Sequence, residues 1–121
     1  MFRLALAGSL ILMLTSNTLV SAQLCASCMP RSVTLIPADG TKGSITPTIK
    51  VLPNTPQGCR QMNIICKTPA GFTRSNMIFN GEGPPKSGKD VTALVSCFKA
   101  SWHTSLAGSY IYVDTVKCRA T

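Results

Sequence analysis

The sequence predicts an all-β fold: a small antiparallel β-sandwich in a single domain, held together by disulfides and preceded by a cleaved signal peptide. Three observations predict it. An apolar leader occupies the N-terminus, six cysteines all follow that leader, and the rest of the chain consists of short apolar segments separated by glycine and proline. The chain has 121 residues and a formal net charge of +8.

The first 22 residues have the pattern of a secretory signal peptide. Arg3 precedes an unbroken apolar run over residues 4–14, and the segment ends in Val20-Ser21-Ala22. Signal peptidase accepts small residues at these positions, so we expect cleavage after Ala22. The apolar run has 11 residues, against roughly 20 for a membrane-spanning helix. The sequence therefore predicts a signal peptide over 1–22, no membrane span, and a secreted, extracellular domain over 23–121.

The first part of this domain is rich in turn residues. Prolines and glycines interrupt residues 37–58 too often for a helix. An edge strand is still expected over Ile45–Leu52. Proline has no backbone N–H to donate, so it is tolerated on the side of an edge strand that has no neighbouring strand.

Four further strands follow from alternation and composition. Gln61–Cys66 sets Met62, Ile64 and Cys66 on one face, and Val91–Cys97 sets its odd-numbered residues on one face. Ser75–Asn80 is short and apolar, and Ser109–Cys118 is β-branched and aromatic, with Tyr112, Val116 and Cys118 on a shared face. Four or five such strands are typical of a small antiparallel sandwich.

The cysteines are predicted to form a disulfide framework. They are Cys25, Cys28, Cys59, Cys66, Cys97 and Cys118, and an even number in a short secreted chain indicates three disulfides. Three predicted strands end in a cysteine, where a bridge would join two sheets at their rim. A redox or zinc role for Cys25-Ala-Ser-Cys28 is disfavoured, because the pair has no helix N-terminus and no second closely spaced ligand pair.

The cysteine pattern resembles the nematode six-cysteine domain, often called the C-six domain. The residues that carry the resemblance span most of the predicted domain: Cys25-Ala-Ser-Cys28, Gly58-Cys59, Ile64-Ile65-Cys66, Gly71-Phe72, Cys97, Ser101-Trp102 and Asp114–Cys118. Members of that family are presumed extracellular and have no assigned biochemical function. The resemblance implies that Cys25 pairs with Cys59.

The remaining four cysteines leave the pairing open. Spacing does not choose between Cys28–Cys118 with Cys66–Cys97 and Cys28–Cys97 with Cys66–Cys118. The second half of the domain is also similar to the second half of complement-control modules, which would favour Cys66 with Cys118. The N-terminal half does not follow that module.

The inventory of ionisable side chains predicts that the protein is not an enzyme and holds no cofactor or metal. It has one histidine, His103, and four acids, Asp39, Glu82, Asp90 and Asp114, none at motif spacing. His103 is expected in a surface turn, since no nucleophile motif accompanies it.

The stretch Gly83–Asp90, GPPKSGKD, comes within one residue of a phosphate-binding loop. Pro84 and Pro85 remove two backbone donors and Asp90 replaces the required hydroxyl, so we expect no nucleotide site but an exposed connection between two strands. Lys86 and Lys89 extend from this exposed connection, so they are candidate contacts for a partner.

The function predicted from these observations is that of a secreted, non-catalytic binding or structural module, monomeric, for an unknown extracellular protein or glycan. One alternative is a protease inhibitor or cationic defence protein that presents residues 80–90 or 37–58 as a rigid loop. Another is an electrostatic binder of anionic glycans, if five basic residues converge on one face: Lys86, Lys89, Lys99, Lys117 and Arg119. The few aromatic residues are expected in the core, which disfavours nucleic acid.

Overall fold

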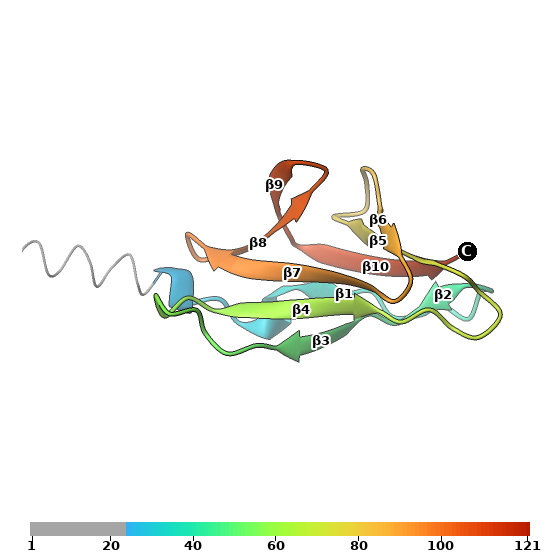
Figure 1. The fold of residues 1–121 in the computed structure, drawn as a ribbon, viewed down its shortest axis with the longest axis horizontal. Helices are drawn as coiled ribbons and strands as arrows, with labels where there is room; N and C mark the ends of the chain where they lie inside the picture. The colour runs from blue at the N-terminus through green and yellow to red at the C-terminus, as the bar shows by residue number, and fades with distance from the viewer. Residues whose placement is uncertain (1–23) are drawn as a thin grey trace, which may run out of the picture.

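The computed structural model describes residues 24–121, which form two β-sheets with a common core (Figure 1). The predicted signal peptide lies outside the described residues. One sheet, here the β10 sheet, contains β1 (Thr34–Leu35), β2 (Ser44–Ile45), β5 (Ser75–Phe79), β6 (Lys86–Gly88) and β10 (Thr115–Ala120). The other, the β7 sheet, contains β3 (Thr48–Val51), β4 (Gln61–Cys66), β7 (Val91–Phe98), β8 (Ser101–Leu106) and β9 (Ser109–Tyr112). A 3-10 helix, η1 (Pro30–Ser32), precedes β1.

Neighbouring strands are antiparallel with one exception. The β7 sheet has the order β3-β4-β7-β8-β9, and in the β10 sheet β5 lies between β10 and β6. On the other side of β10, β1 pairs in parallel with its first residues and β2 pairs antiparallel further along. The predicted all-β sandwich is confirmed, although the described residues contain ten short strands rather than four or five.

The core lies between the two sheets and follows from strand alternation. Every second side chain of β4 and β7 is buried, and the register sets Met62 opposite Val95. The β10 sheet contributes Met77, Phe79 and Val116, all with little or no exposure. The alternation predicted for β4 and β7 is therefore confirmed, and the bounds of β4, β5 and β7 agree with the prediction to within one residue.

The predicted strand Ser109–Cys118 is wrong as one element, because the chain passes from one sheet to the other within it. β9 pairs with β8, whereas β10 pairs with β1, β2 and β5. Tyr112 was expected on the same face as Val116 and Cys118, but it is 60% exposed while both of those are fully buried. The strand alternation does not continue across the crossing.

A second crossing divides the predicted edge strand Ile45–Leu52. Ile45 ends β2 in the β10 sheet and Thr48 begins β3 in the β7 sheet, with Pro47 between them. Proline has no backbone N–H, so at Pro47 the crossing leaves no ladder donor unpaired. β3 is an edge strand, as predicted for the residues after Pro47.

The strand β8 was not predicted, and the placement of His103 in a surface turn is wrong. The turn lies earlier, at Lys99 and Ala100, whose φ angles of 49° and 66° form a two-residue hairpin between Phe98 and Ser101. Turns of this kind normally carry asparagine or glycine. Lys-Ala gave no such signal.

Candidate binding surface

The six cysteines form the three predicted disulfides. The structure contains Cys25–Cys59, the pairing that the resemblance implies, together with Cys28–Cys97 and Cys66–Cys118. Their Cα–Cα separations are 4.7, 5.8 and 5.6 Å, respectively. No cysteine of residues 24–121 is free.

The Cys66–Cys118 disulfide crosses the core of the sandwich. Cys66 ends β4 in one sheet, whereas Cys118 lies inside β10 in the other, and both are fully buried. The expectation that each bridge sits at a strand end on the rim is therefore wrong for Cys118. A covalent link here joins the two sheets within the buried core.

The other two disulfides attach the N-terminal segment to the β7 sheet. Cys28 bonds to Cys97 in β7, and Cys25 bonds to Cys59 just before β4. Arg60 adds hydrogen bonds to the same segment: its Nη1 donates to the carbonyl of Cys28 at 3.0 Å and its backbone N–H to that of Cys25 at 2.9 Å. The segment before η1 is thus fixed against one sheet.

The ionisable side chains that the sequence offered for catalysis are dispersed. Asp39 and Glu82 lie in loops, Asp90 lies in the turn before β7, and Asp114 lies at the crossing between β9 and β10. His103 extends from β8, with its Nδ1 3.0 Å from the carbonyl oxygen of Ser101. The described residues contain no group of three or more His, Cys, Asp or Glu side chains that could hold a metal ion.

The predicted exposed loop over residues 80–90 is in fact partly a strand. β6 lies within it and pairs with β5, which sets Lys86 opposite Met77. Asp90 fixes the turn that follows: its Oδ1 accepts the N–H of Thr68 at 2.7 Å, and its own N–H donates to the Thr68 hydroxyl at 2.9 Å. Lys86 is half-buried and Lys89 is exposed in this turn. Residues 80–90 are therefore not one free loop.

The five basic residues that the glycan alternative would need on one face are spread over the β10 sheet and the turns that precede and follow β7. Lys117 and Arg119 alternate with buried residues of β10, opposite Ile78 and Asn76. Lys86 is opposite the buried Met77 of β5, so its side chain leaves the β10 sheet on the face opposite to that of Lys117 and Arg119. Lys99 lies in the turn between β7 and β8.

The outer surface of the β7 sheet carries a group of exposed aromatic and apolar side chains, which we call the aromatic face: Leu94, Phe98, His103, Tyr110 and Tyr112. Leu94 and Phe98 are about half exposed, and both tyrosines are more than half exposed. The His103 and Tyr110 rings stack with centroids 5.1 Å apart, and Phe98 packs edge-on against them at 5.4 and 5.9 Å. The Nζ of Lys99 lies 5.4 Å from the Phe98 ring centroid. Grouped exposed apolar side chains of this kind mark interaction sites.

A groove of about 440 Å³ lies beside the aromatic face. Tyr110, Ile111 and Tyr112 line it from β9. The end of β5 and the turn that follows contribute Phe79, Asn80, Glu82, Gly83 and Pro84. The Nδ2 of Asn80 donates to the carbonyl of Tyr112 at 2.9 Å, which joins the two walls. In Figure 1 the β8–β9 hairpin and the β5–β6 hairpin project from the same side of the sandwich.

A second hollow, of about 190 Å³, shares Tyr110 with this groove and is also lined by Lys86 and Leu94. Lys86, a candidate contact from the sequence, therefore lies beside the aromatic face. Lys89 lines neither hollow.

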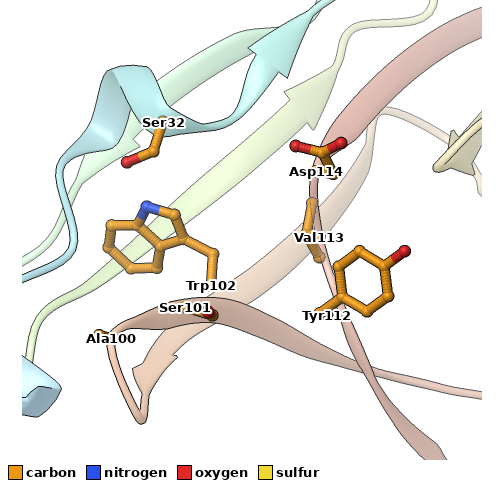
Figure 2. Close-up of a pocket in the computed structure, with 7 residues that line it drawn as sticks. All are labelled: Ser32, Ala100, Ser101, Trp102, Tyr112, Val113 and Asp114. Carbon is orange, nitrogen blue, oxygen red and sulfur yellow. The ribbon is translucent and has the colours of Figure 1, made fainter.

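A third hollow, of about 230 Å³, surrounds Trp102 (Figure 2). Figure 2 shows the indole turned toward the segment that carries Ser32, while the ring of Tyr112 points away from it. Trp102 is buried, and its Nε1 donates to the carbonyl of Met29 at 2.8 Å. Because the only polar atom of this ring already has a partner, Trp102 holds the N-terminal segment in place and offers no free group to a ligand.

Sequence reasoning missed the aromatic face, because it placed Tyr112 in the core and His103 in a turn. The signal that could have found it is the alternation within β9 itself. Tyr110 and Tyr112 share one side of that strand, and Ile111 with Val113 shares the other. The smaller aliphatic pair faces inward.

Comparisons of this chain with protein-family models, with curated proteins and with solved structures found no match. Among residues 24–121, no helix is long and apolar enough to cross a bilayer.

Proposed function

We propose that the protein is a secreted, non-catalytic domain that binds an extracellular protein through its aromatic face. The observation that carries this proposal is the ring cluster of Phe98, His103 and Tyr110 on the outer surface of a sheet whose strands β4 and β7 carry disulfides. Rings that already pack against one another lose little conformational entropy when a partner covers them. Aromatic side chains are also enriched among the residues that carry most binding energy in interfaces.

The extracellular setting is supported by the three disulfides, which persist in oxidising compartments, and by the apolar leader of the sequence. The dispersal of the four acids and His103 supports a non-catalytic role, since acid–base catalysis needs such groups within hydrogen-bonding distance of one another or of a shared substrate atom. Membership of the six-cysteine family would agree with both points.

A protein partner is favoured over an anionic glycan because the basic residues are spread over several surfaces. Lys86 and Lys99 lie near the aromatic face, whereas Lys117 and Arg119 extend from β10 in the other sheet. Binding that depends mainly on charge falls steeply with salt. Elution of the protein from a heparin column only at high salt, with Lys117→Ala and Arg119→Ala eluting earlier, would support the glycan instead.

The test is site-specific photo-crosslinking. A benzophenone amino acid replaces Tyr112 on the aromatic face or, as the control, Lys117 on the other sheet, and each oxidised protein is exposed to secreted proteins of the source organism. We expect one protein to crosslink at position 112 and not at 117.

The captured protein is then produced and its affinity measured. We expect Phe98→Ser to weaken binding by about tenfold or more, as for a central interface residue, and Lys117→Ala to leave it unchanged. Equal affinities for both variants would contradict the proposal, and so would chemical change in the captured protein after incubation.

A further inference from the structure

The free edge of β9 carries backbone groups whose direction follows from the hairpin. β8 and β9 are joined by the two-residue turn Ala107-Gly108, with φ angles of 50° and 83°, and Leu106 is paired with Ser109. In such a hairpin the pair that closes the turn is hydrogen-bonded, and bonded and non-bonded pairs then alternate. Ser109 and Ile111 therefore direct their N–H and C=O toward β8, and Tyr110 and Tyr112 direct theirs away from it.

Two hydrogen bonds fix these directions independently. The N–H of Val113 donates to the carbonyl of Trp102 in β8, at 2.8 Å. The carbonyl of Tyr112 accepts Nδ2 of Asn80, on the opposite side of the strand, at 2.9 Å. The Tyr110 N–H, the Tyr110 C=O and the Tyr112 N–H remain without a partner among residues 24–121.

Prolines lie close to the other edge strands, where they limit the length over which a further strand can pair. β3 lies between Pro47 and Pro53, β6 directly follows Pro84-Pro85, and β1 is followed by Pro37. β9 and its hairpin contain no proline, and β9 reads Ser-Tyr-Ile-Tyr with no charged residue. β9 is therefore the edge strand with neither a charged residue nor a proline near it in the sequence, which leaves it the most open to a further strand.

We propose that the partner contributes an extended peptide segment that adds to β9 as a further antiparallel strand, inside the groove beside it. This inference rests on the proposed function and names the form of its partner. The peptide residue opposite Tyr110 exchanges two backbone hydrogen bonds with it, and a third comes from the Tyr112 N–H. An apolar side chain of the peptide enters the groove between Ile111 and Phe79, both of which line it.

Charge adds a preference for an acidic segment. Lys86 lines the hollow on the other side of Tyr110, and residues 23–121 carry 11 basic against 4 acidic side chains. Glu82 lies on the far wall of the groove, so the acidic residue of the peptide is placed toward Lys86 and its apolar residue toward the groove.

The test uses random dodecamer peptides displayed on phage and selected against the intact oxidised domain, followed by NMR titration with the tightest binder. We expect a micromolar Kd, the largest shifts at residues 79–84 and 109–112, and slowed hydrogen exchange at the Tyr110 N–H. Peptides N-methylated at single backbone positions should lose binding at every second position, since alternate N–H groups of a strand face β9.

A matched pair of variants isolates the backbone bond. Tyr110→Ala and Tyr110→Pro both remove the ring, but only the proline removes the N–H, and that N–H is not part of the β8 ladder. We expect Tyr110→Pro to bind the peptide about tenfold more weakly than Tyr110→Ala, from the loss of one desolvated hydrogen bond. The NMR spectrum of each variant checks that it folds, and the methylated peptides answer the same question on the unmodified protein if the proline variant does not.

Several outcomes would overturn the inference: no selected peptide with a Kd below about 1 mM, shifts confined to other surfaces, or equal affinities of the two Tyr110 variants. The crosslinked partner separates this failure from failure of the proposed function. If Phe98→Ser weakens its binding while the two Tyr110 variants bind equally, the aromatic face binds a partner that adds no strand. If no partner depends on Phe98, the proposed function itself fails.

Discussion

Around Ser75, where β4, β5 and β7 meet in what we call the junction, polar groups are hydrogen-bonded within the protein. At the free edge of β9, several are not. Ser75 is fully buried, and its hydroxyl donates to the carbonyl of Cys66 at 2.8 Å and accepts the N–H of Val91 at 3.0 Å. The Ser75 side chain of β5 thus links the end of β4 to the start of β7 by hydrogen bonds. At β9, three backbone groups of Tyr110 and Tyr112 have no partner within the described chain, and both side chains are exposed.

The difference follows from access to water. A buried donor or acceptor without a partner destabilises the fold by about 1–3 kcal/mol, whereas an exposed one bonds to water at little cost. The protein therefore satisfies every polar group at the junction and can leave the edge open. The backbone groups that have no partner at the edge of β9 are also the ones that another protein can bond to.

The largest expected effect concerns the disulfide next to the junction. Replacing both Cys66 and Cys118 by alanine should lower the free energy of unfolding by about 2–5 kcal/mol, measured by chemical denaturation. The matched variant removes Cys25 and Cys59. The two loops span 52 and 34 residues, so loop entropy separates the two losses by only a few tenths of a kcal/mol.

We therefore expect the core pair to be the more costly by over about 1 kcal/mol, because its removal also leaves a cavity between the sheets. If both double variants lose the same free energy of unfolding, the buried position of the Cys66–Cys118 bridge contributes nothing beyond the closure of a loop.

A smaller effect is expected from the junction hydroxyl itself. Ser75→Ala should destabilise the domain by about 1–3 kcal/mol, since the Val91 N–H and the Cys66 carbonyl lose a buried partner. Ser105→Ala, on exposed β8, is the control and should change stability by less than about 0.5 kcal/mol. If Ser75→Ala and Ser105→Ala melt at the same temperature, the buried hydroxyl contributes no more to stability than the exposed one.

Asn80 connects the two regions, because it follows β5 and supports the crossing from β9 to β10. Its Oδ1 accepts the N–H groups of Asp114 and Thr115 at 2.8 and 3.3 Å, and its Nδ2 bonds to Tyr112. Its φ of 58° favours glycine or asparagine. Asn80→Gly keeps this backbone conformation and removes the side chain, so we expect a loss of about 1 kcal/mol from the hydrogen bonds alone.

The same variant should free the Tyr112 carbonyl and loosen the groove. Hydrogen exchange at residues 109–115 should therefore become faster in Asn80→Gly while exchange in β4 stays slow. Unchanged exchange at the crossing would show that the backbone alone holds it.

The interior of the sandwich was readable from the sequence because burial imposes a period of two. Met62, Ile64 and Val95 occupy alternating positions that no helix would produce. The two sheet crossings were not readable, since a strand that changes sheets keeps the same β-rich composition on both sides. Pro47 marks one crossing, but nothing in the residues 113 and 114 marks the other.

The candidate site was harder to predict than the fold. Lys86 was identified from its position in a Gly/Pro-rich connection, yet its place beside Tyr110 depends on how two hairpins meet in space. The turn Lys99-Ala100 has no residue that typically favours positive φ, so β8 and its His103 were missed. Surface clusters built from three hairpin strands leave little local pattern in the chain.

Almost no effect on stability is expected from a substitution of the exposed Tyr112 on β9. Tyr112→Ser should change the free energy of unfolding by no more than about 0.5 kcal/mol, because the side chain is 60% exposed and stacks on no other ring. The same substitution should weaken partner binding severalfold, as measured by calorimetry with the crosslinked partner. A large stability loss would instead make Tyr112 part of the fold.

A small effect is also expected at Asp39, which is exposed like the β9 edge but hydrogen-bonded like Ser75. The hydroxyl of Thr41 donates to its carboxylate, and so does the Thr41 N–H at 2.9 Å. These bonds lower the pKa of Asp39 from 3.8 to about 2. Bonds to the charged form of a carboxylate favour that form.

Because the pKa is lower in the folded protein, Asp39 stabilises the fold fully above pH 3.8 and loses this contribution as the pH falls toward 2. NMR titration of the Asp39 carboxyl carbon should give a midpoint near 2, and Thr41→Val should raise it, since it removes the hydroxyl donor and leaves the N–H. Exposure should keep the accompanying change in global stability below that of Ser75→Ala, because water competes for the same carboxylate. A midpoint near 3.8 in the unmodified protein would mean that hydrogen bonds in this exposed turn do not persist, and that only burial holds polar groups in place here.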